Sequence, residues 1–374
     1  MAMVLEIIKN VIMECKAVDN ITSESEESQM LSRVSNVIYG YVLPIICVFG
    51  IVGNILNLAI LTRRKLTRSF KTLEQAANIC LTALALSDLM FCLFAFPTTF
   101  LPKDDLYEFK GFLLYYRIYC DAVINVFILT STWLTVTMSV ERYLAICHPF
   151  KQTFFLTIAK TKIIILIVYI VAVIFNIPIL WRYEIIQKVC QNNSETFLHQ
   201  PIRVPLAHSK IVDDAYRVLW AIVGNILPLV LLIGFNICLC RKIHKSYRFR
   251  QKFKKEEQQS NQSDAGQTLT ITLVVIVVMF LILVAPSEMV MHVAQLSHNE
   301  NNATFKMIEV VLNFMQSINF SVNFILYCII SPYFRRTLKY ILCCSWYFQR
   351  KKNYYLEISL KRMTFGSYTK KSTL

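Results

Sequence analysis

A charged triplet, Glu141-Arg142-Tyr143, closes an apolar stretch that covers residues 122–146. A bilayer core needs about 20 residues of helix, so this stretch is long enough to cross it. Charged side chains at the end of such a segment are costly in lipid and are expected to face protein or water. Because Glu141 and Arg142 are neighbours, the carboxylate can partly neutralise the guanidinium until a partner binds. The alternative interpretation is a helix-end arginine that extends to the lipid headgroups.

A second acidic residue, Asp88, stands inside the apolar segment 73–101, in the run Leu84-Ala85-Leu86-Ser87-Asp88-Leu89. A carboxylate in the middle of a membrane span indicates a functional site by default. The alternative is a side chain that joins two helices by a hydrogen bond. Both roles are compatible with one residue.

The elements that would position these side chains follow from composition. The chain is 55% hydrophobic and 17% charged, with a mean hydropathy of +0.48, which is typical of a polytopic membrane protein. Continuous apolar runs, rather than alternating ones, favour helices. The sequence therefore predicts an all-α membrane protein, a seven-transmembrane helix bundle with spans at about 37–62, 73–101, 116–147, 161–181, 215–240, 268–297 and 305–330.

Most of the 39 Lys and Arg residues fall in alternate connecting segments and in the C-terminal tail. The positive-inside rule places these segments in the cytoplasm and the N-terminus outside, in the plasma membrane. This topology explains the net charge of +15 without nucleic-acid binding. The expected regions are an extracellular tail (1–36), a helix bundle (37–331), an amphipathic inner-leaflet helix (332–345) and a cytoplasmic tail (346–374). Sequons predict external glycosylation at Asn20, Asn192 and Asn302.

A series of marks occurs in order along the predicted helices: Gly53-Asn54, Ser87-Asp88, Glu141-Arg142-Tyr143, Pro228, Pro286 and Asn323-Phe324-Ile325-Leu326-Tyr327. Over about residues 37 to 345 the chain resembles the rhodopsin-like (class A) G-protein-coupled receptors. Within them it resembles invertebrate neuropeptide receptors of the FMRFamide type. That finer likeness rests on the Glu-Arg-Tyr variant, Cys147-His148-Pro149, Trp181 and Phe324.

The resemblance implies a receptor, not an enzyme, that binds an extracellular, short, amidated neuropeptide and activates a heterotrimeric G protein. The residues implied in activation and coupling are Glu141, Arg142, Tyr143, Asn323, Tyr327, Phe280 and Pro286. The family's Trp of the sixth helix is Val284 here, and a Tyr of the fifth helix is Asn236. We therefore expect Phe280 to carry more of the switching.

The resemblance also implies an allosteric sodium ion inside the bundle, and no other cofactor. The oxygen donors would come from Asp88, Ser131, Asn319 and Asn323. A carboxylate with neutral oxygens is a suitable set for a hard cation. The alternative is a hydrated polar network without sodium.

For the ligand, the resemblance argues against two classes. The acidic position of amine receptors is Ile124 here, and the retinal-binding Lys position is Ser317. Polar residues near the outer ends of the third and sixth helices, namely Asp121, Asn125, Glu288 and His292, form the expected ligand site. Asp121 and Glu288 would receive a cationic side chain of the peptide. The alternative is that Glu288 pairs internally with His292 or Arg117.

In the family, a cysteine at the top of the third helix pairs with one in the second outer loop, but that position is Arg117 here. Cys120 lies one turn deeper, so a Cys120–Cys190 disulfide is expected, with Cys15–Cys190 as the alternative. Cys343 and Cys344 follow the predicted amphipathic helix and are candidates for palmitoylation.

The C-terminal Ser372-Thr373-Leu374 fits a ligand for a PDZ domain, and the Ser and Thr residues of the tail could recruit arrestin once phosphorylated. Other functions remain as alternatives: a receptor for a lipid or another small molecule, or a membrane transporter. A transporter predicts internal repeats and paired broken helices, which this sequence lacks.

Overall fold

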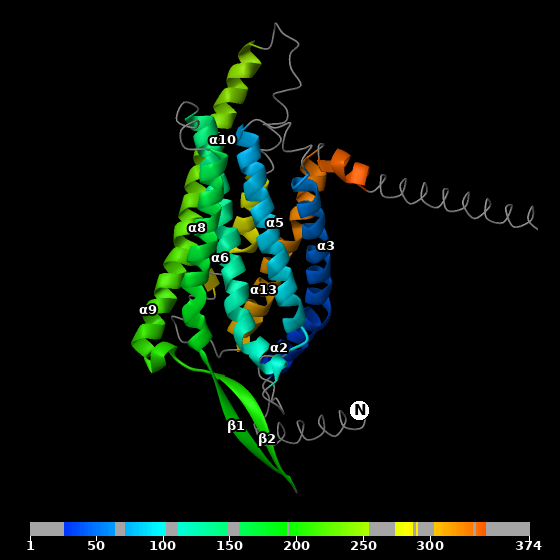
Figure 1. The fold of residues 1–374 in the computed structure, drawn as a ribbon, viewed down its shortest axis with the longest axis vertical. Coiled ribbons are helices and arrows are strands. Elements are labelled where there is room, and N and C mark those ends of the chain that lie inside the picture. The colour runs from blue at the N-terminus through cyan, green and yellow to red at the C-terminus, as the bar shows by residue number, and fades with distance from the viewer. Residues whose placement is uncertain are drawn as a thin grey trace, which may run out of the picture. The chain divides into compact units, whose positions relative to one another are not determined.

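The computed structural model describes residues 26–63, 72–101, 111–148, 157–192, 194–253, 274–286, 289–290, 303–331 and 334–341. In these ranges, 6 helices are long and apolar enough to cross a membrane, and a shorter apolar helix covers Val274–Leu283. The predicted all-α bundle is confirmed. Its helices run side by side along the long axis of the molecule (Figure 1).

The first three spans are continuous helices. The first passes through α2 (Glu26–Val37), η1 (Ile38–Val42) and α3 (Leu43–Leu61), and so begins inside the segment expected to be a tail. The second is α5 (Thr72–Thr98), and the third is α6 (Phe112–Cys147). Pro97 lies inside α5, one residue before the helix ends.

The remaining spans are more often interrupted. The fourth joins α8 (Ile158–Asn176) to the 3₁₀ turn η2 (Ile177–Trp181). The fifth joins α9 (Lys210–Trp220), η4 (Ala221–Ile226) and α10 (Leu227–Phe253), after a short turn, η3 (Leu206–His208). The seventh is α13 (Ala303–Ile330).

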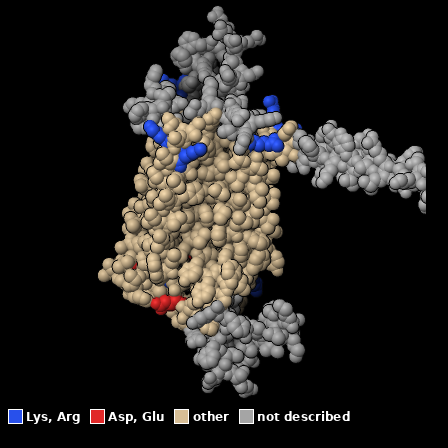
Figure 2. Space-filling view, in the orientation of Figure 1, with Lys and Arg blue, Asp and Glu red and all other residues tan. Residues whose placement is uncertain are grey.

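A β-hairpin connects the fourth and fifth spans. Strands β1 (Tyr183–Asn192) and β2 (Ser194–Arg203) pair antiparallel, with Tyr183 opposite Arg203. The hairpin projects from one end of the bundle, which we call the hairpin end; α10 projects from the other, which we call the basic end (Figure 1). Exposed Lys and Arg gather toward the basic end, while acidic side chains show at the hairpin end (Figure 2).

Each of the two π-helical turns ends two residues before a proline. Pro44 follows η1, and Pro228 follows η4. Proline has no N–H to donate, so the carbonyl four residues earlier loses its helical partner and the turn widens. Within η4 the backbone N–H bonds to the carbonyl five residues earlier, as Leu227 does to Ile222. Pro228 has no N–H for the Val223 carbonyl, which instead accepts from the indole of Trp133 at 3.2 Å.

Two tyrosine hydroxyls also link pairs of helices by donating to a backbone carbonyl of the neighbouring helix. Tyr116 on α6 donates to the carbonyl of Phe94 on α5 at 2.7 Å. The Tyr169 hydroxyl donates to Ala83 at 3.0 Å, joining α8 to α5. Hydrogen bonds between membrane helices contribute about 0.6 kcal/mol each, so their value lies mainly in fixing the register.

Residues from Tyr327 onward form a second compact unit. Residues 334–341 are helical, with Phe334, Leu338 and Ile341 more buried than the exposed Arg335 and its basic neighbours. The ring centroids of Tyr327 and Phe334 are 5.5 Å apart. Arg335 donates from Nη1 to the carbonyl of Ile329 at 2.6 Å, which covers the C-terminal end of α13.

Candidate functional sites

The carboxylate of Asp88 is fully buried inside the bundle. Ser131 Oγ donates to its Oδ1 at 3.0 Å, and Asn323 Nδ2 donates to its Oδ2 at 2.6 Å. The three side chains come from α5, α6 and α13. The structure thus brings together three of the four residues proposed from the sequence as sodium ligands.

Asn319, the fourth of these residues, is buried one helical turn before Asn323 on α13. Residues four apart on a helix share a face, so Asn319 lies on the side that carries Asn323. Ser131 donates its hydroxyl hydrogen bond to Asp88, so the lone pairs of its oxygen remain available to a cation. The donor set of one carboxylate and neutral oxygens therefore fits a hard monovalent ion.

Beside this network, the first and seventh spans approach closely. Asn54 Nδ2 donates to the carbonyls of Gly50 and Phe320, at 3.0 and 2.9 Å. A Cβ on Gly50 would meet the side chain of Ser321 and would lie 2.6 Å from the Cys92 sulfur. Only glycine fits where these three helices meet.

At the basic end, Glu141 and Arg142 are both 3% exposed. The Glu141 carboxylate accepts hydrogen bonds at Oε1 from Thr161 Oγ1 on α8, at 3.2 Å, and from Cys80 Sγ on α5, at 3.5 Å. The sequence suggested that Glu141 partly neutralises Arg142. Its hydrogen bonds also join the second, third and fourth spans.

Tyr143, the last member of the triplet, packs toward the fifth span. Its ring centroid lies 5.2 Å from that of Phe235, and its hydroxyl lies 3.2 Å from Nε2 of His148. Asn236 on α10 donates from Nδ2 to the Oγ of Ser139, which lies two residues before the triplet, at 3.2 Å. This bond links α10 to α6 at the position where the resemblance to the receptor family predicts a tyrosine.

Phe280 is buried in an apolar cluster with Val136, Leu232, Val277 and Val284. The cluster joins α6, α10 and the helix that covers Val274–Leu283. Val284, which replaces the tryptophan of the family, lies one turn from Phe280 and donates its backbone N–H to the Phe280 carbonyl. The helix ends at Leu283, Val284 forms a turn, and residues 285–286, which include Pro286, are helical again.

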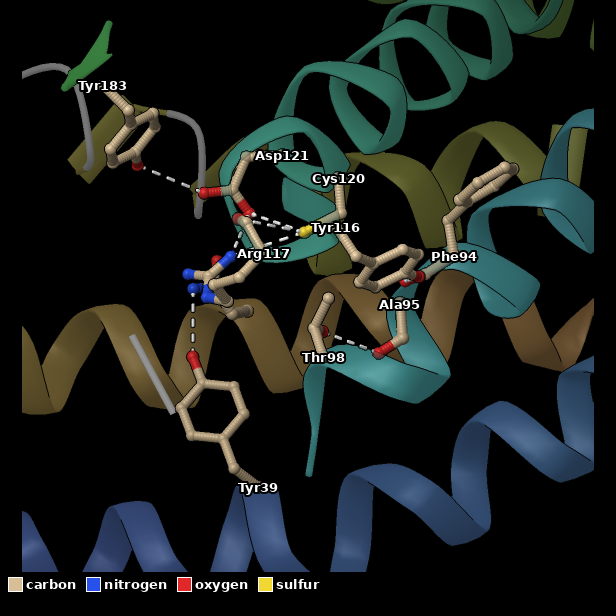
Figure 3. Close-up of polar contacts among 10 residues, drawn as sticks. Tyr39, Phe94, Ala95, Thr98, Tyr116, Arg117, Cys120, Asp121 and Tyr183 are labelled. Carbon is tan, nitrogen blue, oxygen red and sulfur yellow. Dashed lines mark hydrogen bonds and ion pairs between the residues drawn. The ribbon is translucent and has the colours of Figure 1, made fainter. Parts of the chain in front are cut away.

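At the hairpin end, Asp121 is held from two sides (Figure 3). Arg117 Nη1 lies 3.1 Å from its Oδ1, and the Tyr183 hydroxyl donates to its Oδ2 at 3.4 Å. The sequence predicted that Asp121 binds a ligand, and it offered Arg117 only as an alternative partner of Glu288. The i,i+4 spacing of Arg117 and Asp121 already indicated this ion pair.

Cys120 lies in the same group of side chains as a free, buried thiol, so the structure does not contain the expected Cys120–Cys190 disulfide. Its sulfur is directed back toward its own helix, 3.4 Å from Arg117 Nη1 and 3.5 Å from the Arg117 carbonyl. Because Cys120 lies about one turn deeper than the usual cysteine position, its thiol is buried against residues of α6.

A second ion-pair group at the hairpin end was not predicted. Asp213 on α9 is 5% exposed, and its Oδ1 lies 2.9 Å from Arg182 Nη2. Arg217 Nε lies 2.8 Å from Oδ2 of the same carboxylate. The Arg182 guanidinium stands 5.3 Å from the Tyr216 ring centroid. The i,i+4 spacing of Asp213 and Arg217 was a signal in the sequence.

Several predicted site residues fall outside the described parts of the chain: Asn20, Glu288, His292, Asn302, Cys343, Cys344 and Cys15 of the alternative disulfide. Cys190 and Asn192 belong to β1, but their side chains are not described. Asn125 is half-buried one turn from Asp121 on α6. Tyr327 is buried within the second unit.

A helical membrane bundle with polar groups at both ends of α6 and a buried carboxylate network between them has the organisation of a transmembrane receptor. The chain belongs to the rhodopsin family of seven-transmembrane receptors, whose family model matches residues 53–327. The members of this family are signalling receptors, so the prediction of a non-enzymatic protein is confirmed.

The chain is similar to several curated invertebrate receptors. It is 25% identical to the FMRFamide receptor of Drosophila melanogaster over 82% of this chain and 54% of that protein. A probable G-protein coupled receptor of Caenorhabditis elegans is 25% identical, over 82% and 69%. The sex peptide receptor of Drosophila melanogaster is 22% identical, over 81% and 72%. The chain thus spans about half the length of the first of these relatives.

Proposed function

We propose that the chain is a plasma-membrane receptor that binds an extracellular peptide and activates a heterotrimeric G protein. The observation that carries this proposal is the layout of α6. One end of this helix bears Asp121 in a polar cluster at the hairpin end, and the other end bears the buried Glu141 and Arg142 at the basic end. The Asp88 network lies between them, so one rigid helix connects all three sites.

The direction of insertion follows from charge. The basic end would face the cytoplasm, where Lys and Arg are retained, and the hairpin end would face outside together with the N-terminus. In this orientation Asp121 is near the ligand side and Arg142 is near the G protein. Arrestin and a PDZ-domain protein remain candidate partners of the C-terminal tail.

A peptide is the proposed ligand class because relatives named for FMRFamide and for sex peptide match most of this chain. The sequence suggested that Asp121 and Glu288 bind a cationic side chain of the peptide. Since Asp121 already pairs with Arg117, such a cation would have to compete for that carboxylate, which gives Glu288 the larger role. The Glu288→Gln change would weaken a cationic peptide far more than its neutral analogue; equal losses would rule out the contact.

The test uses cells that express the full chain, challenged with a library of amidated neuropeptides while calcium and cyclic nucleotide are recorded. We expect a selective response that Arg142→Gln abolishes at unchanged surface expression. The matched control, Arg33→Gln, alters an exposed arginine at the start of the first span and is expected to keep the response. Silence across the library with surface expression intact would contradict the peptide class. Responses to lipids or other small molecules would then support the alternative.

A sodium ion at Asp88 is proposed as an allosteric ligand, on the strength of the donor set described above. When bound there, it would supply a positive charge that balances the buried carboxylate. Ser131 and Asn323 would orient that carboxylate whether or not the ion is present.

A further inference from the structure

The two ion-pair groups at the hairpin end follow one plan. In each, an aspartate holds an arginine of its own helix at i,i+4 with one oxygen and a residue from the root of the hairpin with the other. Asp121 Oδ1 takes Arg117, and its Oδ2 takes Tyr183. Asp213 Oδ2 takes Arg217, and its Oδ1 takes Arg182.

The hairpin residues involved, Arg182 and Tyr183, are consecutive in the chain. One reaches the aspartate on α9 and the other reaches the aspartate on α6. The carbonyl of Arg182 also accepts a hydrogen bond from the Val204 N–H at 2.9 Å, which closes the hairpin at its base. Both strands therefore leave the bundle from one short, doubly anchored point.

Burial makes these contacts directional. The side chains of Arg182 and Asp213 are 11% and 7% exposed, so this contact is withdrawn from water. In the other group Arg117 is 5% exposed, while Asp121 is 30% exposed and only its partner is buried. Charge-assisted hydrogen bonds withdrawn from water are short and geometrically specific. The i,i+4 arginines hold each carboxylate in place, so that its second oxygen points at the hairpin.

We propose that this pair of aspartate-centred contacts, which we call the hairpin clamp, fastens the hairpin to the third and fifth spans without a covalent bond. Cys120 is a free thiol and is 2% exposed, so it does not fasten the loop to α6. The attachment of the hairpin root to these two spans then depends on Arg182 and Tyr183 and not on a described thiol of either span. This inference concerns the attachment of the loop and does not depend on the identity of the ligand.

Hydrogen–deuterium exchange on the purified full-length chain in lipid nanodiscs tests the clamp, with exchange in the buried part of α5 as the internal reference. We expect Asp121→Asn and Arg182→Met each to speed exchange across 183–203 by about tenfold, the factor that corresponds to one lost charge-assisted hydrogen bond. A reductant should leave the exchange of the unmodified chain unchanged, as should Cys120→Ser.

Tyr183→Phe provides a milder variant, since it removes only the hydroxyl that reaches Asp121. Tyr183→Phe should speed hairpin exchange by about threefold. The control Tyr115→Phe, on the exposed face of α6, should have no effect. Faster hairpin exchange after reduction of the unmodified chain would overturn the proposal, because it would show that a disulfide holds the loop. Unchanged hairpin exchange in Tyr183→Phe and Arg182→Met would overturn it as well.

Discussion

Asp88 and Asn323 are 235 residues apart in the chain, yet the Asn323 amide donates to the Asp88 carboxylate at 2.6 Å in the middle of the bundle. With Ser131 on the other oxygen, this contact makes the carboxylate of the second span a common acceptor for donors on the third and seventh spans. Any relative movement of these helices must rearrange the hydrogen bonds of a fully buried group.

Removing the Asn323 amide should therefore be costly. Asn323→Ala leaves one oxygen of the buried carboxylate without its donor, and we expect a loss of about 1.5–3 kcal/mol in the free energy of unfolding. Asn313→Ala is the matched control on the same helix, because its amide donates to the neutral Tyr39 hydroxyl and should cost about 1 kcal/mol. Thermal and denaturant unfolding in detergent measure both. Equal losses would contradict the special role of Asp88.

Sodium should stabilise the chain through the same carboxylate. At a sodium concentration about ten times its Kd, the ion should add about 1.4 kcal/mol to the unfolding free energy. N-methylglucamine at equal ionic strength should not replace it. Asp88→Asn should remove the sodium effect, whereas stabilisation that persists in this variant would place the ion elsewhere or show a general salt effect.

Thr161 and Cys80 should be coupled in their effect on stability. Both donate to the same oxygen of Glu141, so each can partly satisfy it when the other is removed. Thr161→Val and Cys80→Ala should each cost about 1 kcal/mol, and the double variant should cost about 0.5–3 kcal/mol more than their sum. Pairing Cys80→Ala with Thr82→Val is the control cycle, because Thr82 donates to the carbonyl of Asn78 within its own helix. Additive losses in the first cycle would show that the two donors act independently.

The close approach of three spans at Gly50 predicts a position-specific effect of alanine. Gly50→Ala should lose about 1–3 kcal/mol, because the new methyl group meets Cys92 and Ser321. Gly234→Ala is the control: a Cβ there meets nothing within 4 Å, so the helix should gain up to about 1 kcal/mol. Unfolding midpoints of the two variants should move in opposite directions.

Much of this arrangement could be predicted from the sequence because it depends on composition and spacing. Long apolar runs predicted the spans, and the order of the polar marks predicted that Asp88, Ser131 and Asn323 would meet. The rotation of each helix about its axis is set by packing, which no single run of residues encodes. The bonds from Thr161 and Cys80 to Glu141 therefore emerged only in three dimensions.

At the hairpin end, two ion pairs were not predicted. The i,i+4 spacing of Arg117–Asp121 and Asp213–Arg217 indicated both, but only a ligand-binding role was considered for Asp121, and Asp213 was not considered. The ligand-binding role of Asp121 stays a prediction. The disulfide prediction placed Cys120 by its distance along the chain. The shift from position 117 to position 120 is three residues, which moves the side chain about 4.5 Å along the axis and turns it by about 60°, enough to seat the thiol among helix residues.

The bond from Trp133 to the widened turn η4 restricts how the third and fifth spans can move. Sliding α6 by a single residue would shift the indole by about 1.5 Å and stretch a 3.2 Å hydrogen bond beyond its range. Tyr116 sets a similar limit against α5. These two bonds allow the third span to rotate or bend but oppose sliding along its axis. A stimulus at one end must reach the other as rotation or bending of the helices around it.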